Sequence, residues 1–246
     1  MTSATNDLRA ADSRGADPRS PVHPAPVEQP ALAEHPAAAA AELRDIRVRH
    51  GEVRALDGVS VTLHPGEVLA LAGHNGSGKS TLLSVIAGTL APRSGSVQRT
   101  GRVAFVVQRS DVPDALPLTV RDVVRMGRWA QRGSWRRLTR DDHAIVAESI
   151  GALGLDGLER RPLATLSGGQ RQRALVAQGL AQRAGILLLD EPTVGLDDEA
   201  RDLIDAAIAR EAARGVAVVH ATHDAEVIRL ADRVIRLERG AVAAAH

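Results

Sequence analysis

The sequence contains no cysteine and no tyrosine, and Phe105, Trp129 and Trp135 are its only phenylalanine and tryptophan residues. Without cysteine, the chain has neither a disulfide framework nor a thiolate metal site. So few aromatic side chains argue against a stacking surface for single-stranded nucleic acid. The formal net charge of +1 gives no general attraction to nucleic acid or anionic lipid. Nucleic acid is therefore not an expected partner.

Long hydrophobic runs are also missing. The longest, residues 186–189 and 215–219, are far shorter than the ~18 residues that indicate a membrane span. Residues 1–7 do not form a charged segment followed by an apolar block, so no signal peptide is expected. A cytoplasmic location fits these absences, and any role at a membrane would come through a partner.

Lysine occurs once, as Lys79, and the other 30 of the 31 basic residues are arginine. Lysine is a compact, rotatable charge, whereas arginine is a rigid planar fork. Lys79 stands in a full match to the P-loop pattern G-x-x-x-x-G-K-[ST], where lysine reaches the β- and γ-phosphates and backbone N–H groups surround them. The pattern predicts nucleotide binding by Gly73, His74, Asn75, Gly76, Ser77, Gly78, Lys79 and Ser80.

Composition divides the chain into three parts. Residues 1–41 are rich in proline, alanine, aspartate and arginine and predict a disordered tail. Residues 42–240 carry the periodic patterns of one folded domain, and residues 241–246 are expected to be a short C-terminal tail. Within the domain, residues 109–180 look mainly helical and are expected to form a sub-domain.

The remaining pattern predicts an α/β fold, in which a parallel-sheet core carries an antiparallel edge and the helical sub-domain. Alternating patterns predict antiparallel strands, and continuous apolar runs predict buried parallel ones. Strands are expected at 43–48, 59–63, 67–72, 103–107, 186–189, 216–220 and 234–237. Helices are expected at 79–90, 119–129, 140–153, 168–183, 198–214 and 224–230.

Polar residues at the ends of predicted strands supply further candidates for chemistry. Asp190 follows an apolar strand and is a candidate for holding Mg²⁺, although such an aspartate can also cap the next turn. Glu191, one residue on, is placed to orient and deprotonate an attacking water. His223 could contact the γ-phosphate. Gln108 could offer an amide oxygen to Mg²⁺.

A second anion-receptive helix start is predicted at Leu166, Ser167, Gly168, Gly169 and Gln170. One γ-phosphate does not need two such loops from one chain. We therefore expect a composite site, in which another subunit donates the second loop.

With these motifs in this order, residues 42–240 resemble the ATP-binding cassette family, specifically the nucleotide-binding subunit of an ABC transporter. The resemblance implies a P-loop NTPase fold, ATP hydrolysis with Mg²⁺, and a head-to-tail dimer that encloses two ATP molecules. It extends the phosphate loop to Thr81, and it makes Gln108, Asp190 and Ser80 metal-contacting residues. It makes Glu191 the catalytic base, helped by His223 and Lys79. It also places Asp197 and residues 166–170 at the nucleotide of the opposite subunit.

The sequence departs from the family at His50, His74 and Val194. His50 stands where the family usually stacks an aromatic residue on adenine, so a modest loss of affinity is expected. His74 replaces a frequent proline and is expected to point away from the phosphates. Val194 replaces a usual serine or threonine before the segment that includes Asp197.

The resemblance also bears on the transported substrate. Residues 116–128 look like the corresponding segment of zinc/manganese-type importer ATPases, a region that contacts the permease. We therefore expect the ATPase of a divalent-metal importer at the cytoplasmic face of the membrane. Its partners would be a second like subunit, permease subunits and an extracytoplasmic substrate-binding protein. The alternatives are an iron-chelate importer, an exporter, or a soluble ABC protein acting on DNA or ribosomes.

The arginines between residues 125 and 140 admit two readings, a solvated helical face or a surface that meets permease loops or lipid headgroups. His220 lies near His223, but no third ligand accompanies them, so a zinc site is not expected there.

Overall fold

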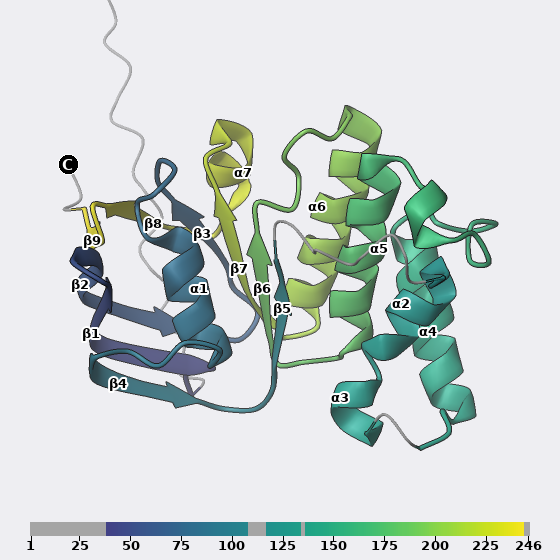
Figure 1. Ribbon diagram of the computed structural model, residues 1–246, viewed down its shortest axis with the longest axis horizontal. Coiled ribbons are helices and arrows are strands. Elements are labelled where there is room, and N and C mark those ends of the chain that lie inside the picture. The colour runs from purple at the N-terminus through teal and green to yellow at the C-terminus, as the bar shows by residue number, and fades with distance from the viewer. Residues whose placement is uncertain (1–37, 108–116, 134–135, 244–246) are drawn as a thin grey trace, which may run out of the picture. The chain divides into compact units, whose positions relative to one another are not determined.

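The computed structural model describes residues 38–107, 117–133 and 136–243. Most of the expected tail, 1–41, therefore lies outside the described residues, as does Gln108. The described part is built from strands and helices that alternate along the chain (Figure 1). The strands are β1 (Ala41–His50), β2 (Val53–Leu63), β3 (Val68–Ala72), β4 (Ser94–Arg99), β5 (Val103–Val106), β6 (Ile186–Asp190), β7 (Ala217–Thr222), β8 (Arg233–Glu238) and β9 (Ala241–Val242).

The strands form two sheets. The central sheet has the order β5-β6-β7-β3-β8-β9, and all its pairings are parallel except that of β9 with β8. The second sheet, of order β2-β1-β4, is antiparallel. This arrangement confirms the expected parallel α/β core with an antiparallel edge. Because parallel strands end at the same edge of a sheet, the residues that follow β3, β6 and β7 are brought together there.

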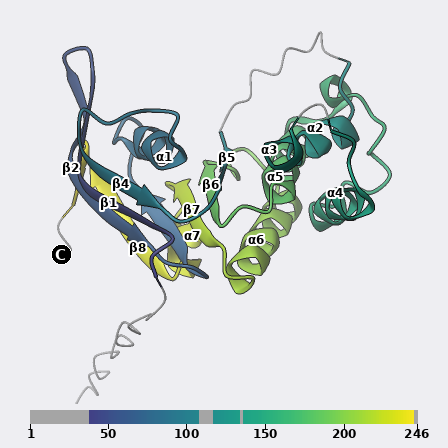
Figure 2. The ribbon, with the colours of Figure 1, turned by 90° about the horizontal axis from the view of Figure 1, so that it is seen from below.

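The helices are α1 (Lys79–Ala87), α2 (Val120–Met126), α3 (Trp129–Arg132), α4 (Arg140–Ala152), α5 (Gly168–Ala181), α6 (Asp198–Ala213) and α7 (Ala225–Leu230). A short 3₁₀ turn, Leu163–Thr165, precedes α5. In both ribbon views α1 and α5 lie on opposite sides of β5 and β6 (Figures 1 and 2). Helices α2, α4 and α5 pack together as the expected helical sub-domain.

Several boundaries differ from the sequence-based expectation. Helix α1 ends before Gly88, which adopts φ 79°, rather than near Pro92. The helix expected over 119–129 is divided into α2 and α3 around Gly127, where a Cβ would come within 2.4 Å of the carbonyl oxygen of Gln178. Polar β4 was not expected; it is held by pairing with β1. Strand β9 occupies part of the expected C-terminal tail.

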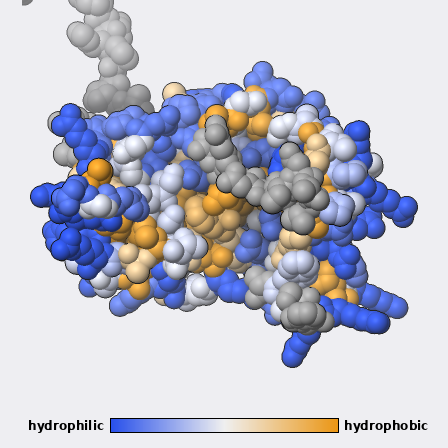
Figure 3. Space-filling model, in the orientation of Figure 1, coloured by the Kyte–Doolittle hydropathy of each residue, from blue (hydrophilic) through white to orange (hydrophobic). Residues whose placement is uncertain are grey.

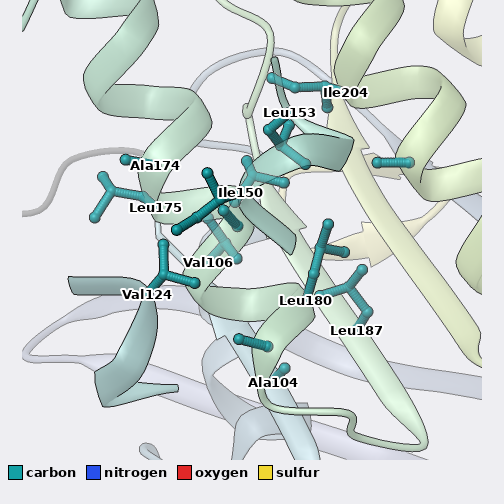
Figure 4. Packing of buried hydrophobic residues seen from close by; sticks show 14 of the residues in the cluster. Ala104, Val106, Val124, Ile150, Leu153, Ala174, Leu175, Leu180, Leu187 and Ile204 are labelled. Atoms are coloured by element: carbon teal, nitrogen blue, oxygen red, sulfur yellow. The ribbon is translucent and has the colours of Figure 1, made fainter. Parts of the chain in front are cut away.

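Two hydrophobic clusters cover opposite faces of the central sheet. Along β6, Ile186 and Leu188 join the cluster beneath α1 and the antiparallel sheet, whereas Leu187 and Leu189 join the cluster formed with α2, α4, α5 and α6. Figure 4 shows the second cluster, in which Leu187 lies beside Leu180 of α5. Burial on both faces explains the uninterrupted apolar sequence of β6.

Hydrophilic and hydrophobic residues are distributed unevenly over the surface. On the face shown in Figure 3, hydrophilic residues occupy the margins and hydrophobic residues gather near the middle. Across the described ranges, no helix combines the length and the apolar character needed to cross a bilayer.

Candidate functional site

The phosphate loop connects the end of β3 to the first residue of α1, Lys79. Two of its glycines are required by their surroundings. Gly78 has φ 108°, and a Cβ there would lie 2.6 Å from the carbonyl oxygen of Ala55. At Gly73, with φ 155°, a Cβ would lie 2.5 Å from the carbonyl oxygen of Leu237. The loop therefore presses its backbone against two neighbouring segments and starts the helix with free N–H groups.

Lys79 is folded back into this loop. Its Nζ donates to the carbonyl oxygens of Gly73 at 2.8 Å and His74 at 3.3 Å, and lies 3.3 Å from Oε1 of Glu191. The residue is only 6% exposed. Beside it, the fully buried hydroxyl of Ser77 has no hydrogen-bond partner within the described residues. The ammonium group is thus fixed at the floor of the loop.

The carboxylate of Glu191 lies between two nitrogen groups. Nδ1 of His223 lies 2.9 Å from Oε2 and 3.1 Å from Oε1, and Oε1 is also the oxygen that contacts Lys79. The backbone of Glu191 adopts φ 50°, and its N–H donates to the carbonyl oxygen of Ala221 at 3.0 Å. Because β6 and β7 are paired in parallel, the residues that follow them meet at the sheet edge. This unusual backbone turn aims Glu191 toward the phosphate loop.

Asp190 provides a test of whether the residues fit Mg²⁺. It is 5% exposed, and its Oδ1 has no hydrogen-bond partner in the described part of the chain. Burial raises the pKa of Asp190, while a hydrogen bond with Ser80 opposes that rise. A carboxylate and a hydroxyl side by side are hard oxygen donors, which Mg²⁺ prefers. Across the described ranges, no three acidic, histidine or cysteine residues form a complete metal cage, and Mg²⁺ usually completes its shell with water and phosphate oxygens.

An open cleft of about 380 Å³ lies against the phosphate loop. Its lining residues are His50, Val53, Arg54, Ala55, Asn75, Gly76, Gly78, Lys79, Ser80, Thr81, Asp190 and Glu191. The structure therefore brings His50 to the same cleft as the predicted phosphate-binding and acidic residues. Sequence reasoning missed Val53, Arg54 and Ala55; their nearness to His50 along the chain was the available signal.

The second loop is found elsewhere. Ser167 caps α5 by accepting a hydrogen bond from the N–H of Gln170 at 3.2 Å, and the side chain of Gln170 accepts one from the N–H of Ser167. Ser167 and Gly168 are exposed, and nothing lies within 4 Å of the position of a Cβ on Gly168. None of the described residues that line the cleft comes from Leu166–Gln170.

Two other predicted site residues, His74 and Asp197, are not among the described residues that line this cleft. Nδ1 of His74 lies 2.7 Å from the carbonyl oxygen of Asn75, and His74 lines a separate cleft together with His223. Asp197 caps α6 by accepting from the N–H of Ala200 at 2.9 Å. Gln108 lies outside the described residues, so its expected contact with Mg²⁺ stays a prediction.

The chain is similar to known proteins both in sequence and in fold. The family model described as ABC transporter matches residues 56–194. A hemin import ATP-binding protein of Streptomyces coelicolor is 40% identical over 240 residues, which covers 92% of this chain and 82% of that protein. A zinc import ATP-binding protein of Paramagnetospirillum magneticum is 36% identical over 207 residues, covering 83% and 76%. A metal-chelate type ABC transporter solved in an inward-facing conformation has a TM-score of 0.75 at 28% identity, covering 83% of this chain and 82% of that one.

Proposed function

Because the chain belongs to the ABC transporter family, we propose that it is the ATPase subunit that powers import of an iron chelate of the hemin type. The family hydrolyses ATP and uses Mg²⁺, and the fold here is that of its ATP-binding domain. The observation that carries the catalytic part of the proposal is the contact of one buried carboxylate, Glu191, with both Lys79 and His223.

Nucleotide binding starts at the phosphate loop. The triphosphate enters the cleft with its β- and γ-phosphates over the N-terminus of α1, where unpaired N–H groups and the helix dipole favour negative charge. Lys79 exchanges its carbonyl and carboxylate contacts for phosphate oxygens. The adenine ring of the nucleotide then lies against His50, Val53 and Arg54, which line the same cleft.

Glu191 acts as the general base in this proposal. When Lys79 turns to the phosphates, the carboxylate keeps its contact with His223, and Oε1 loses the neighbouring ammonium and can accept a proton from the attacking water. General-base assistance contributes about 10²–10⁴ in rate. His223, whose side chain is 58% exposed, is free to follow the γ-phosphate and to hold Glu191 in orientation.

Ser80 and Asp190 would hold Mg²⁺, Ser80 through its hydroxyl and Asp190 through the unpaired carboxylate oxygen. When bound, the ion supplies positive charge to the phosphate oxygens. Its removal is therefore expected to abolish turnover while leaving the protein folded.

The exposed loop at Ser167 belongs to the nucleotide of a second copy. Ser167 and Gly168 are exposed in their own chain, and no residue of the loop lines the cleft of that chain. Two copies arranged head to tail satisfy both facts, because each loop then closes the cleft of the other. Each ATP would be held by Lys79 of one copy and Ser167 of the other.

The substrate proposal rests on the relatives. The hemin import protein shares more identity, over more of this chain, than the zinc import protein does, and the solved structure reported above is of the metal-chelate type. This favours an iron chelate over the zinc or manganese ion expected from residues 116–128. Zinc import remains the second candidate because of the 36% identity to the zinc import protein. In either case the cargo passes through a permease, delivered by an extracytoplasmic binding protein, with this subunit at the cytoplasmic face.

The test is growth of a deletion strain of the encoding organism. Restoring the gene is expected to allow growth with hemin as the only iron source and to leave growth under zinc limitation unchanged. Glu191→Gln in the same vector serves as the inactive control. Rescue under zinc limitation alone would replace the iron-chelate proposal by zinc import, and equal rescue by Glu191→Gln would refute the catalytic proposal.

A further inference from the structure

The C-terminal end of α5 is attached to the segment that contains α2 and α3. Nη1 of Arg128 donates to the carbonyl oxygen of Ala181 at 2.7 Å, and Nε2 of Gln131 donates to the carbonyl oxygen of Gln182 at 2.7 Å. The last carbonyls of a helix have no partner within it and form the negative end of its dipole. Arg128 therefore satisfies this end of α5 with both a hydrogen bond and a positive charge.

Arg128 is buried, although the sequence placed it in a basic stretch that was read as a solvated or partner-facing surface. It is 3% exposed, and its counter-ion Asp142 in α4 is 1% exposed. Nε of Arg128 donates to Oδ1 of Asp142 at 3.0 Å, and Nη2 donates to Gln131 at 2.6 Å. Nε of Arg132 donates to the other oxygen of Asp142 at 3.0 Å. The guanidinium of Arg128 thus donates one hydrogen bond to each of α3, α4 and α5.

Asp142 is held in its charged form. Burial alone would raise the pKa of Asp142, but hydrogen bonds from Thr139 and Arg128 and the charge of Arg132 keep it well below its usual range. A buried charge pair of this kind costs desolvation free energy, so its presence is weak evidence for stability as such. The Arg128–Asp142 pair is better explained by its geometry, because it fixes the positions of the helices that it joins.

We propose that Arg128 is a positioning residue for Ser167: it clamps the C-terminal end of α5 to the α2–α3 segment, so that any displacement of this segment swings the loop at the other end. Helix α5 has 14 residues, which places its two ends about 20 Å apart at 1.5 Å per residue. A tilt of a few degrees at the anchor therefore moves Ser167 by an ångström or more. The inference rests on the proposed function, because it requires Ser167 to act on the ATP of a second copy.

The clamp can be removed without leaving a buried charge unpaired. The double variant Arg128→Met with Asp142→Asn keeps an acceptor for Thr139 at the start of α4 and eliminates the hydrogen bond to Ala181. We expect a melting temperature near that of the wild type and a Kd for ATP of the monomer within twofold. We expect kcat to fall at least 10-fold and, in the Glu191→Gln background, ATP-driven dimerisation to weaken at least 10-fold.

A matched control exists at the same helix end. Nη2 of Arg102 donates to the carbonyl oxygen of Arg183 at 3.2 Å, but Arg102 is exposed and lies outside the α2–α3 segment. Arg102→Ala should leave kcat and dimerisation unchanged. Should the double variant fail to fold, Gln131→Ala removes two hydrogen bonds of the clamp, the one to Gln182 and the one from Arg128, and is expected to lower kcat three- to fivefold at constant Kd.

Two results would overturn this inference and leave the proposed function intact. Wild-type kcat and dimerisation in a folded double variant, or in Gln131→Ala where the double variant does not fold, would show that the clamp is only structural. Equal losses in Arg102→Ala would show that any change at this helix end has the effect. Full turnover by Ser167→Arg would instead remove the composite site itself, and with it both the dimer proposal and this inference.

Discussion

Nζ of Lys79 lies 3.3 Å from Oε1 of Glu191, and both side chains are about 5% exposed. The cation that is to bind phosphate and the carboxylate that is to activate water therefore neutralise each other in this structure. Nucleotide supplies stronger negative charge and competes for Lys79. Nucleotide binding therefore also releases Glu191 from Lys79. This coupling keeps Glu191 from acting as a base before the triphosphate arrives.

Replacing Glu191 by glutamine separates binding from turnover. Glu191→Gln keeps the shape of the side chain and a contact to His223, but it removes the carboxylate that competes with phosphate for Lys79. We expect the Kd for ATP to stay the same or fall, and turnover to drop by about 10²–10⁴, with a trapped dimer in gel filtration. Glu199→Gln, at an exposed glutamate, is the control. Normal hydrolysis by Glu191→Gln would disprove the base assignment.

The loop should also discriminate between lysine and arginine. Lys79 is surrounded by the carbonyl oxygens of Gly73 and His74 within 3.3 Å, which leaves little room for a planar guanidinium. Lys79→Arg keeps the charge, and we expect it to weaken ATP binding at least 10-fold, measured by titration calorimetry. His74→Ala changes a side chain of the same loop that is turned to Asn75 and should alter the Kd less than twofold. Equal affinity of the wild type and Lys79→Arg would rule out this steric argument.

A bulky residue at position 167 should block the contact between copies. Ser167→Arg removes the cap of α5 and places a long side chain on an exposed loop. We expect monomeric ATP binding to persist, while dimerisation and turnover are lost by at least 10²-fold. Ser167→Thr keeps a capping hydroxyl and should retain most activity. If Ser167→Arg turned over ATP at full speed as a monomer, the composite site would be refuted.

Local patterns explain why much of the site could be predicted. The phosphate loop is one continuous segment whose glycines and lysine each have a local reason, and Asp190 and Glu191 directly follow an uninterrupted apolar strand. These features depend on neighbours in sequence and on the parallel pairing of β6 and β7.

Contacts between distant segments could not be predicted in the same way. The distance from Glu191 to His223 depends on strand register and on the positive φ of Glu191. The burial of Arg128 depends on an aspartate 14 positions away and on a carbonyl in another helix. Strand β4 has no hydrophobic alternation in its sequence, and it forms through its backbone pairing with the edge of β1. In each case the structure depends on a contact with a segment distant in sequence, and the neighbouring residues show no pattern that would predict that contact.

Asp205 in α6 gives a test by pH. Burial is the largest cause that raises the pKa of Asp205 from 3.8 to about 6; Arg201 opposes the rise, and Asp202, Asp224 and Glu226 add to it. The folded state then holds a proton that the unfolded state has lost, so this carboxyl costs stability as pH rises from about 4 to 6. Asp205→Asn should stabilise the protein by about 1 kcal/mol at pH 8, after discounting for partial exposure, with no gain at pH 4. Urea unfolding at both values measures this, and an equal gain at pH 4 would contradict it. Glu199→Gln, at an exposed position of the same helix, should change the stability by less than about 0.5 kcal/mol.

His220 in β7 should have the opposite dependence. It is 1% exposed, its Nε2 has no hydrogen-bond partner within the described ranges, and burial lowers its pKa from 6.5 to about 4, against the charge of Asp224. The unfolded state therefore binds a proton first, and stability is lost as pH falls from about 6.5 toward 4. His220→Leu removes that loss, so the variant should lose about 2 kcal/mol less than the wild type between pH 7.5 and pH 5. Urea unfolding at the two pH values gives both differences, and His143→Leu, at an exposed histidine, should behave as the wild type does. An unchanged pH dependence in His220→Leu would show that this imidazole is not what makes the fold sensitive to acid.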